Sequence, residues 1–289
     1  MAHPSVPDRR SIRDHLILTY RRLRHSPEVS QAKLRRFIEE ARRSPIPDLP
    51  SGPPRSLCLV IPCFGHAAYL PDTIASIVSQ TRPPDQIVFV EDRSPDGTAV
   101  LLDEFMRSPA VAGADRFRVV SNEANIGQAA SLNRGIAEAS TDLVMILNDD
   151  DYLMHDAVES MLGFFSASPG VALIGTGGVH VAGRDALLEA PKLSSSYSTP
   201  GSRLEVHTPA DARHYRNYND LNMTHSGSCF YRIAWQAVGG YRPRGGRVVP
   251  FTDRDFQLRV NAIWPVAVAH QTPLAFWRSD TSVDAGINS

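Results

Sequence analysis

Short apolar runs alternate with amphipathic helical patterns between residues 57 and 165, and few architectures accommodate that alternation. The runs have no polar face and are too short for core helices, which is typical of strands buried on both sides. They lie at residues 57–61, 87–90, 117–120 and 143–147, and helical patterns follow at 70–80, 100–106, 129–139 and 156–165. The alternation predicts an α/β domain whose mostly parallel sheet is flanked by helices.

A polar cluster follows each of these predicted strands, at residues 62–66, 91–98, 122–128 and 148–151. Ligands of such sheets bind outside the carboxyl ends of the strands, so we expect the four clusters to meet at one edge. The loop after the first strand lacks a GxGxxG pattern, which argues against a dinucleotide cofactor.

The cluster at 148–151 reads Asn148-Asp149-Asp150-Asp151 and follows five consecutive apolar residues. Adjacent carboxylates repel one another, so gathering them at a strand end calls for a compensating charge. Mg²⁺ or Mn²⁺ prefers oxygen ligands and would supply that charge while holding a diphosphate. The alternative is a solvated acidic turn that caps the next helix.

The charge of the chain is unevenly distributed. Residues 1–55 contain 12 basic and six acidic residues, whereas the rest contains 18 basic and 25 acidic residues. The net charge of −1 argues against a nucleic-acid-binding protein. The three cysteines form neither a disulfide framework nor a zinc site, and the ten histidines show no metal cluster. Without a transmembrane run or a signal peptide, a cytoplasmic protein is expected.

Residues 8–43 predict two helices separated at Ser26-Pro27, and residues 44–54, with five prolines, predict a linker. We expect a helical hairpin that packs on the main domain or on a second subunit, as in a homodimer. The other interpretation is a basic surface that meets anionic lipid or an anionic acceptor, at the periphery of a membrane.

The pattern is looser beyond residue 171. We predict strands at 171–175 and 228–231, a hairpin at 179–188, and helices at 233–238 and 253–263. Residues 190–222 are irregular, and a loop of that length in a compact domain is usually functional or mobile.

The chain resembles family 2 glycosyltransferases of the GT-A fold over roughly residues 57 to 283. The segments that carry the resemblance are Val60-Ile61-Pro62-Cys63-Phe64-Gly65, Val90-Glu91-Asp92-Arg93-Ser94-Pro95-Asp96-Gly97-Thr98, Asn125-Ile126-Gly127-Gln128, Asn133-Arg134-Gly135-Ile136, Leu147-Asn148-Asp149-Asp150-Asp151, Gly239-Gly240-Tyr241 and Thr252-Asp253-Arg254-Asp255-Phe256-Gln257-Leu258-Arg259. Each is weak alone, but together they occur in the family's order and spacing. The Pro-rich linker marks a domain boundary, so we expect residues 1–51 to form a helical extension with this linker and residues 52–289 to form the GT-A domain that the resemblance implies. Within it, 57–151 would bind the nucleotide and 152–289 the acceptor.

The resemblance also implies the transfer of a sugar, with inversion, from a nucleotide-diphosphate sugar to an acceptor hydroxyl. A UDP-sugar is the expected donor. Pro62 and Phe64 would wall the nucleobase, and Asp92 would accept the uracil N3–H. Asn125 and Gln128 would lie near the nucleotide, where the third crossover helix begins.

The remaining roles fall on three carboxylates. Asp150 matches the family's metal ligand for Mn²⁺ or Mg²⁺, and Asp149 would contact the ribose or share the metal. Asp253 matches the general base that takes the proton of the acceptor hydroxyl. The acceptor would be a glycan, a lipid-linked molecule or a small molecule.

Four further residues are weaker candidates for contacts with the acceptor or the donor sugar: His225, Arg247, Trp277 and Arg278. Arg247 belongs to a glycine- and arginine-rich segment, 239–247, that is typical of a mobile lid. Asn148 stands where the family usually has Asp, and Trp277-Arg278-Ser279-Asp280 lacks the family's histidine.

Two alternatives remain. A sugar-1-phosphate nucleotidyltransferase would need a glycine-rich basic loop after the first strand, and residues 62–66 do not provide one. The other is a subunit that binds a nucleotide sugar without catalysing its transfer. The presence of both Asp150 and Asp253 argues against this alternative.

Overall fold

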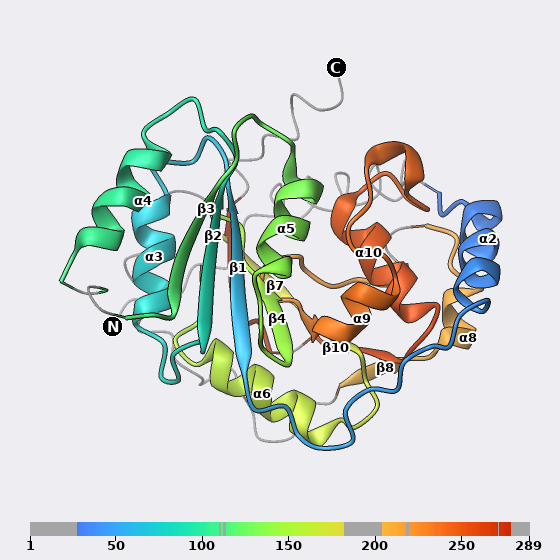
Figure 1. The fold of residues 1–289 in the computed structure, drawn as a ribbon. Helices are drawn as coiled ribbons and strands as arrows, with labels where there is room; N and C mark the ends of the chain where they lie inside the picture. The colour runs from blue at the N-terminus through green and yellow to red at the C-terminus, as the bar shows by residue number, and fades with distance from the viewer. Residues whose placement is uncertain are drawn as a thin grey trace, which may run out of the picture.

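The protein is described by a computed structural model at residues 28–109, 111, 114–181, 204–217, 220–270 and 272–278, with backbone alone at 178–181. Its centre is an eight-stranded sheet in the order β3-β2-β1-β4-β9-β6-β10-β8 (Figure 1). Helices flank this mostly parallel sheet, which confirms the predicted α/β class. None of the described helices combines the length and the apolar character needed to cross a bilayer.

The first half of the sheet is parallel, with β1 (Leu57–Cys63) between β2 (Gln86–Glu91) and β4 (Leu143–Ile146), and β3 (Phe117–Ser121) beside β2. All seven residues of β1 are buried, as expected of a central strand. The intervening helices are α3 (Leu70–Val78), α4 (Thr98–Arg107) and α5 (Gln128–Ala137). A Cβ at Gly135 of α5 would lie 2.7 Å from side-chain atoms of Val60 and Val90, so glycine lets this helix approach the sheet closely.

In the second half, β9 (Cys229–Tyr231) pairs antiparallel with both β4 and β6 (Leu173–Thr176). β10 (Val266–Ala269) continues the sheet parallel to β6, and β8 (Glu205–His207) closes it antiparallel. The helical elements here are α6 (Ala157–Ala167), α8 (Pro209–Ala212), α9 (Arg232–Ala237), η3 (Arg244–Gly246) and α10 (Thr252–Asn261). The sequence analysis does not predict β8, α8 or β10, and it treats the segment containing β8 and α8 as irregular.

A second sheet places β11 (Ala275–Arg278) between β5 (Tyr152–Leu153) and β7 (Gly178–Val181). β7 is the start of the hairpin predicted at 179–188, but it pairs parallel with β11. The rest of that hairpin lies outside the described residues. Because β5 follows the carboxylate cluster directly, this small sheet brings the end of the described chain to the same edge of the molecule.

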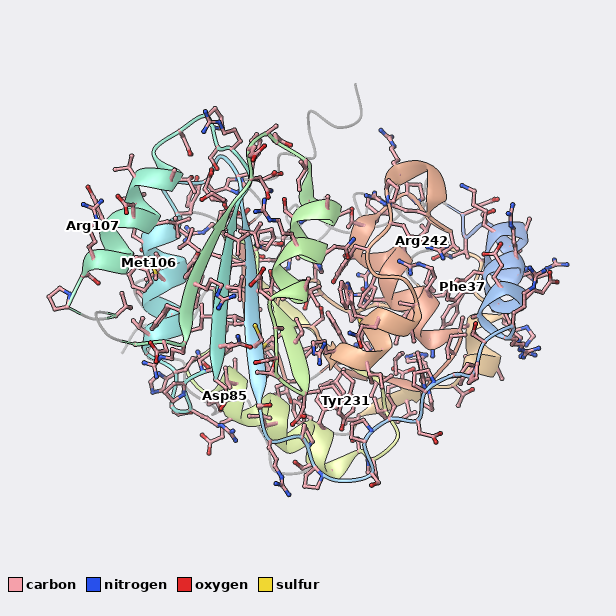
Figure 2. The ribbon with its side chains drawn as sticks, in the orientation of Figure 1. Phe37, Asp85, Met106, Arg107, Tyr231 and Arg242 are labelled. Atoms are coloured by element: carbon pink, nitrogen blue, oxygen red, sulfur yellow. The ribbon has the colours of Figure 1, made fainter. Side chains whose placement is uncertain are left out.

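Helix α2 (Gln31–Ala41) packs on the second half of the domain, beside α8 and α10 (Figure 1). It begins at Ser30, whose side chain accepts a hydrogen bond from Lys33 N. Its apolar stripe, with Leu34 and Phe37, is buried in the common core. The guanidinium of Arg242 lies over the Phe37 ring at 5.1 Å from its centroid, and Figure 2 shows the two side chains together. The first predicted N-terminal helix lies outside the described residues.

We expect Phe37→Ala to lower the free energy of unfolding by about 3–5 kcal/mol, because a buried aromatic side chain is lost and a cavity remains. Urea unfolding monitored by circular dichroism measures this effect. Arg36→Ala is the matched control on the same helix, since the Arg36 side chain is 82% exposed. Its unfolding midpoint should not change. A Phe37→Ala midpoint equal to that of the control would mean that α2 is not part of the cooperative core.

Candidate active site

A cavity of about 940 Å³ opens at the carboxyl edge of the sheet. The loops after β1, β2, β3 and β4 form one side, and residues of β11, α10 and the loop before β9 form the other. It brings together eleven residues that the sequence analysis selects: Pro62, Phe64, Asp92, Asn125, Gln128, Asp149, Asp150, His225, Asp253, Trp277 and Arg278. Arg247 is not among the described residues that line it.

Asp92 follows β2 and is only 3% exposed. Its Oδ1 accepts hydrogen bonds from the backbone N–H of Ile126 at 2.8 Å and from Asn122 Nδ2 at 2.7 Å. Its Oδ2 accepts one from the backbone N–H of Gly127 at 2.9 Å. A carboxylate has about four acceptor positions, so these three bonds leave room for one further donor from a ligand.

The loop before α5 depends on glycine. Gly127 has φ +81°, a left-handed conformation that a side chain would strain. This conformation directs its N–H toward Asp92, while Asn125 Oδ1 accepts the same N–H at 3.0 Å. Gln128, the first residue of α5, donates to Asn148 Oδ1 at 3.4 Å, so the β3 loop contacts the carboxylate cluster.

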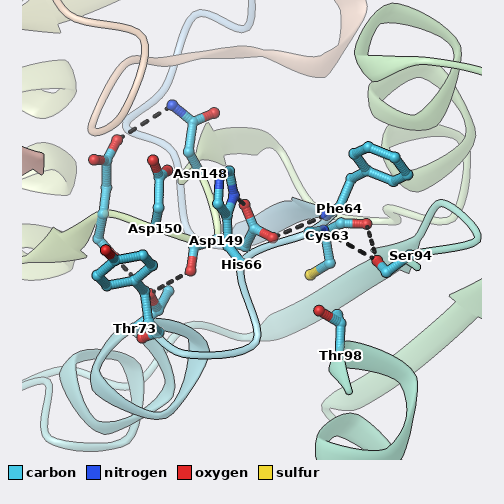
Figure 3. Close-up of polar contacts among 12 residues, drawn as sticks. Cys63, Phe64, His66, Thr73, Ser94, Thr98, Asn148, Asp149 and Asp150 are labelled. Carbon is cyan, nitrogen blue, oxygen red and sulfur yellow. Dashed lines mark hydrogen bonds and ion pairs between the residues drawn. The ribbon is translucent and has the colours of Figure 1, made fainter. Parts of the chain in front are cut away.

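Asp149 connects the carboxylate cluster to the loop after β1 (Figure 3). Its Oδ2 accepts the backbone N–H of Phe64 at 2.9 Å, and its Oδ1 lies 2.8 Å from His66 Nδ1. The buried hydroxyl of Thr73 on α3 lies 2.8 Å from the Asp149 carbonyl. The Asp149 carboxylate is therefore held on both oxygens.

His66, Asp149 and Asp150 offer ligand atoms that all lie within 4.8 Å of one another. One imidazole and two carboxylates suit Mn²⁺ and similar divalent ions. Burial raises the pKa of Asp149, and the charge of Asp150 raises it further, although His66 opposes both. A cation would relieve this crowding of negative charge, so the residues fit a divalent metal. The sequence analysis finds no metal cluster among the histidines, whereas the structure places His66 in this candidate group.

Asp151 stabilises the conformation of the turn through hydrogen bonds. It is 3% exposed, and its Oδ2 accepts hydrogen bonds from Ser226 Oγ and, at 3.2 Å, from Asn148 Nδ2. Burial, with the charge of Asp150 as the next cause, raises the pKa of Asp151 to about 7. An aspartate at position 148 would place a second carboxylate against Asp151 where the amide of Asn148 donates. This contact explains why asparagine suits position 148 here.

Asp253 lies in the first turn of α10, half-buried on the cavity wall. The helix begins after Phe251 without a side-chain cap, so Asp253 does not cap it. Among the described residues, none donates a hydrogen bond to its carboxylate. The carboxylate is thus available to a ligand in the cavity.

The neighbouring acid Asp255 has a different environment. It is fully buried, and its carboxylate accepts hydrogen bonds from Val248 N at 2.6 Å and from Arg259 Nη2 at 2.7 Å. Arg259 also donates to the carbonyls of Val238 and Gly240. This ion pair ties α10 to the segment after α9, and neither residue lines the cavity.

His225 lies in the loop before β9, with its Nε2 at 3.3 Å from the Tyr241 hydroxyl. Burial lowers the pKa of His225, although the charge of Asp253 opposes this shift. Asn133 on α5 holds Tyr241 by accepting its N–H and donating to its carbonyl, both at 2.8 Å. His225 therefore contacts the Tyr241 ring, which Asn133 holds in place, and it lies close to Asp253.

The other weaker candidates have distinct positions. Trp277 is half-buried on the cavity wall. The Arg278 side chain is 2% exposed and donates to Asp150 O at 2.6 Å. Arg247 donates to the carbonyls of Arg242 and Pro250, so its guanidinium holds its own loop together. Lys33 of α2 donates to two carbonyls of this loop, which is docked on α2 rather than over the cavity.

Several cavity residues are not selected from the sequence. His66 could have been found from its position in the loop after a predicted strand. Asn222, Thr224, Ser226 and His270 lie in segments with no recognisable pattern, and only the fold brings them to the cavity. Arg254 lies in the segment that carries the resemblance, but the sequence analysis gives it no role.

The family model described as glycosyl transferase family 2 matches residues 58–230, more than half of the chain. The chain is 29% identical over 132 residues to the poly-beta-1,6-N-acetyl-D-glucosamine synthase of Staphylococcus epidermidis, a match that covers 46% of this chain and 30% of that protein. The chain therefore spans less than a third of the length of this curated relative.

Solved structures show a similar fold. The S. aureus TarS 1–349 structure in complex with UDP-GlcNAc has a TM-score of 0.57 at 13% identity, covering 78% of this chain and 59% of that one. The mannosyltransferase PcManGT from Pyrobaculum calidifontis, in complex with GDP-Man and Mn²⁺, has a TM-score of 0.53 at 17% identity, covering 85% of this chain and 64% of that one. These likenesses confirm the predicted GT-A fold.

Proposed function

Because the chain belongs to glycosyl transferase family 2, we propose that it transfers a sugar from a nucleotide-diphosphate sugar, preferably a UDP-sugar, to an acceptor hydroxyl with inversion. The observation that carries the proposal is one cavity with Asp92 and the carboxylate cluster on one side and the half-buried Asp253 on the other. Its donor half and its acceptor half therefore face the same space. The acceptor is a glycan, a lipid-linked molecule or a small molecule.

The nucleotide lies against the loops after β1, β2 and β3. The Phe64 ring and Pro62 wall the base, and both line the cavity. The free acceptor position of Asp92 takes the N3–H of uracil, a donor that cytosine lacks. Asn125 and Gln128 border the ribose side of the same space, together with Asp149.

Asp150 is the principal metal ligand, with Asp149 and His66 as the neighbouring donors, for Mn²⁺ or Mg²⁺. Such a cation neutralises the diphosphate and makes it a better leaving group. The mannosyltransferase PcManGT, whose structure contains Mn²⁺ and GDP-Man, supports a metal role in this fold.

Asp253 accepts the proton of the acceptor hydroxyl as the oxygen forms a bond to the anomeric carbon. The bond from that carbon to the phosphate oxygen breaks on the opposite face, and its electron pair leaves with the nucleoside diphosphate. His225 and Trp277 border the space where the acceptor and the sugar meet.

A thermal-shift screen of UDP- and GDP-sugars with and without Mn²⁺ tests the proposal. A bound ligand raises the melting temperature by mass action. We expect the largest shift with one UDP-sugar in Mn²⁺. If no nucleotide sugar produces a shift, the cavity is not a donor site.

Phe64→Ala should weaken binding of UDP by about tenfold or more, because stacking of a base on an aromatic ring contributes about 1–3 kcal/mol. Calorimetry with UDP in Mn²⁺ measures this change. Phe64→Tyr retains the ring and should bind like the wild type. The backbone N–H that donates to Asp149 is present in all three proteins, so equal affinity of the alanine variant would mean that the base does not stack there.

A further inference from the structure

One buried arginine connects the second sheet to the carboxylate turn. Arg278 ends β11, and its Nε donates to the carbonyl of Asp150 at 2.6 Å. Its backbone N–H donates to Asp151 Oδ1 at 3.2 Å. Arg278 therefore binds two consecutive residues of the turn. It contacts the main-chain carbonyl of Asp150 and the side-chain carboxylate of Asp151.

The far side of the guanidinium is also occupied. Arg278 Nη2 donates to Asp72 Oδ2 on α3 at 3.2 Å. The guanidinium lies over the Tyr69 ring, with its carbon 4.5 Å from the ring centroid, a favourable cation–π geometry. The first turn of α3 and the residue before it thus fix the plane of the guanidinium, and the guanidinium in turn fixes the peptide unit of Asp150.

We propose that Arg278 is a positioning residue that aims the Asp150 carboxylate at the metal. The inference rests on the proposed metal role of Asp150. A side chain leaves the main chain in a direction set by the adjacent peptide units, so holding the Asp150 carbonyl restricts where its carboxylate points. Groups that orient metal ligands in this way typically change metal affinity 10- to 100-fold when they are removed.

The competing interpretation is direct contact between Arg278 and the substrate, as the sequence analysis predicts, because Arg278 also lines the cavity. The two roles predict different effects on binding when the metal and the nucleotide are measured separately. A positioning residue affects the binding of the metal alone, whereas a phosphate contact affects the binding of UDP even when no metal is present.

The test is Arg278→Gln, with Mn²⁺ affinity measured by the electron paramagnetic resonance signal of free Mn²⁺ without nucleotide. We expect about 10- to 100-fold weaker Mn²⁺ binding and unchanged UDP affinity in EDTA. The control is Arg232→Gln, because Arg232 also donates to a main-chain carbonyl, that of Thr141 at 3.3 Å, at the other end of β4. It should bind Mn²⁺ like the wild type.

Asp72→Asn keeps the test decisive if Arg278→Gln fails to fold. Asp72 is 31% exposed and is not among the described residues that line the cavity, yet it accepts from Arg278. We expect a smaller loss of Mn²⁺ affinity, which should not add to that of Arg278→Gln because both act through one contact.

Two results would overturn the inference: unchanged Mn²⁺ affinity in folded variants, or loss of UDP binding in EDTA. A wild-type protein that binds no Mn²⁺ would instead refute the proposed metal role, and this inference with it.

Discussion

Asp253→Asn should reduce turnover by at least about 10²-fold while leaving the affinity for the donor sugar nearly intact. A carboxylate can accept the proton of the acceptor hydroxyl, whereas the isosteric amide cannot, so the loss falls on the chemical step. The half-buried position of Asp253 on the cavity wall, with no described residue donating to its carboxylate, leaves it available for this role. Turnover with saturating donor and calorimetry of donor binding separate the two effects.

The alternative for Asp253 is a favourable interaction with the amino-terminal end of α10, worth about 0.3–1 kcal/mol in stability and nothing in turnover. Asp156→Asn is the matched control, since Asp156 precedes α6 and is not among the described residues that line the cavity. It should leave turnover unchanged. If Asp253→Asn keeps more than about a tenth of wild-type turnover, a general-base role is excluded. Asp255 cannot then replace it, because its carboxylate is buried and bonded to Arg259.

Asp150→Ala should abolish the effect of divalent cations on nucleotide binding. For the wild type we expect UDP to bind about tenfold or more tightly in Mn²⁺ than in EDTA, a difference of roughly 1.4 kcal/mol or more. Without the Asp150 carboxylate, His66 and Asp149 remain, and their side chains already contact each other at 2.8 Å. Calorimetry of UDP under both conditions measures the effect.

Asp115→Ala controls for nonspecific binding of Mn²⁺, because Asp115 is exposed in the loop before β3 and is not among the described cavity residues. It should retain the full difference between Mn²⁺ and EDTA. If wild-type UDP affinity is the same in EDTA and in Mn²⁺, the acidic cluster is not a metal site. The buried carboxylates of Asp149 and Asp151 would then only hold the turn in place.

Local sequence patterns predicted β1 to β4 and the helices between them with ends that differ by only a few residues. Burial on both faces and helical periodicity are properties of a short segment, so they can be recognised without knowledge of the fold. The same patterns did not reveal β10 and β11, because alanines and, in β11, an arginine interrupt the run of large apolar residues that marks the predicted strands. Their pairing partners, β6 and β7, lie far away in the sequence.

By itself, the sequence determined the fold class, the edge of the sheet where the polar loops meet, and eleven of the described residues that line the cavity. These conclusions depend on residue type and on position after a strand. Only the tertiary structure distinguished the members of each cluster. Asp149 and Asp151 are engaged by groups from other elements, through His66 and Ser226, and Asp255 is neutralised by Arg259 although Asp253 is only two residues away. Burial and hydrogen bonding decide what a carboxylate can do, and both are set by residues distant in the chain.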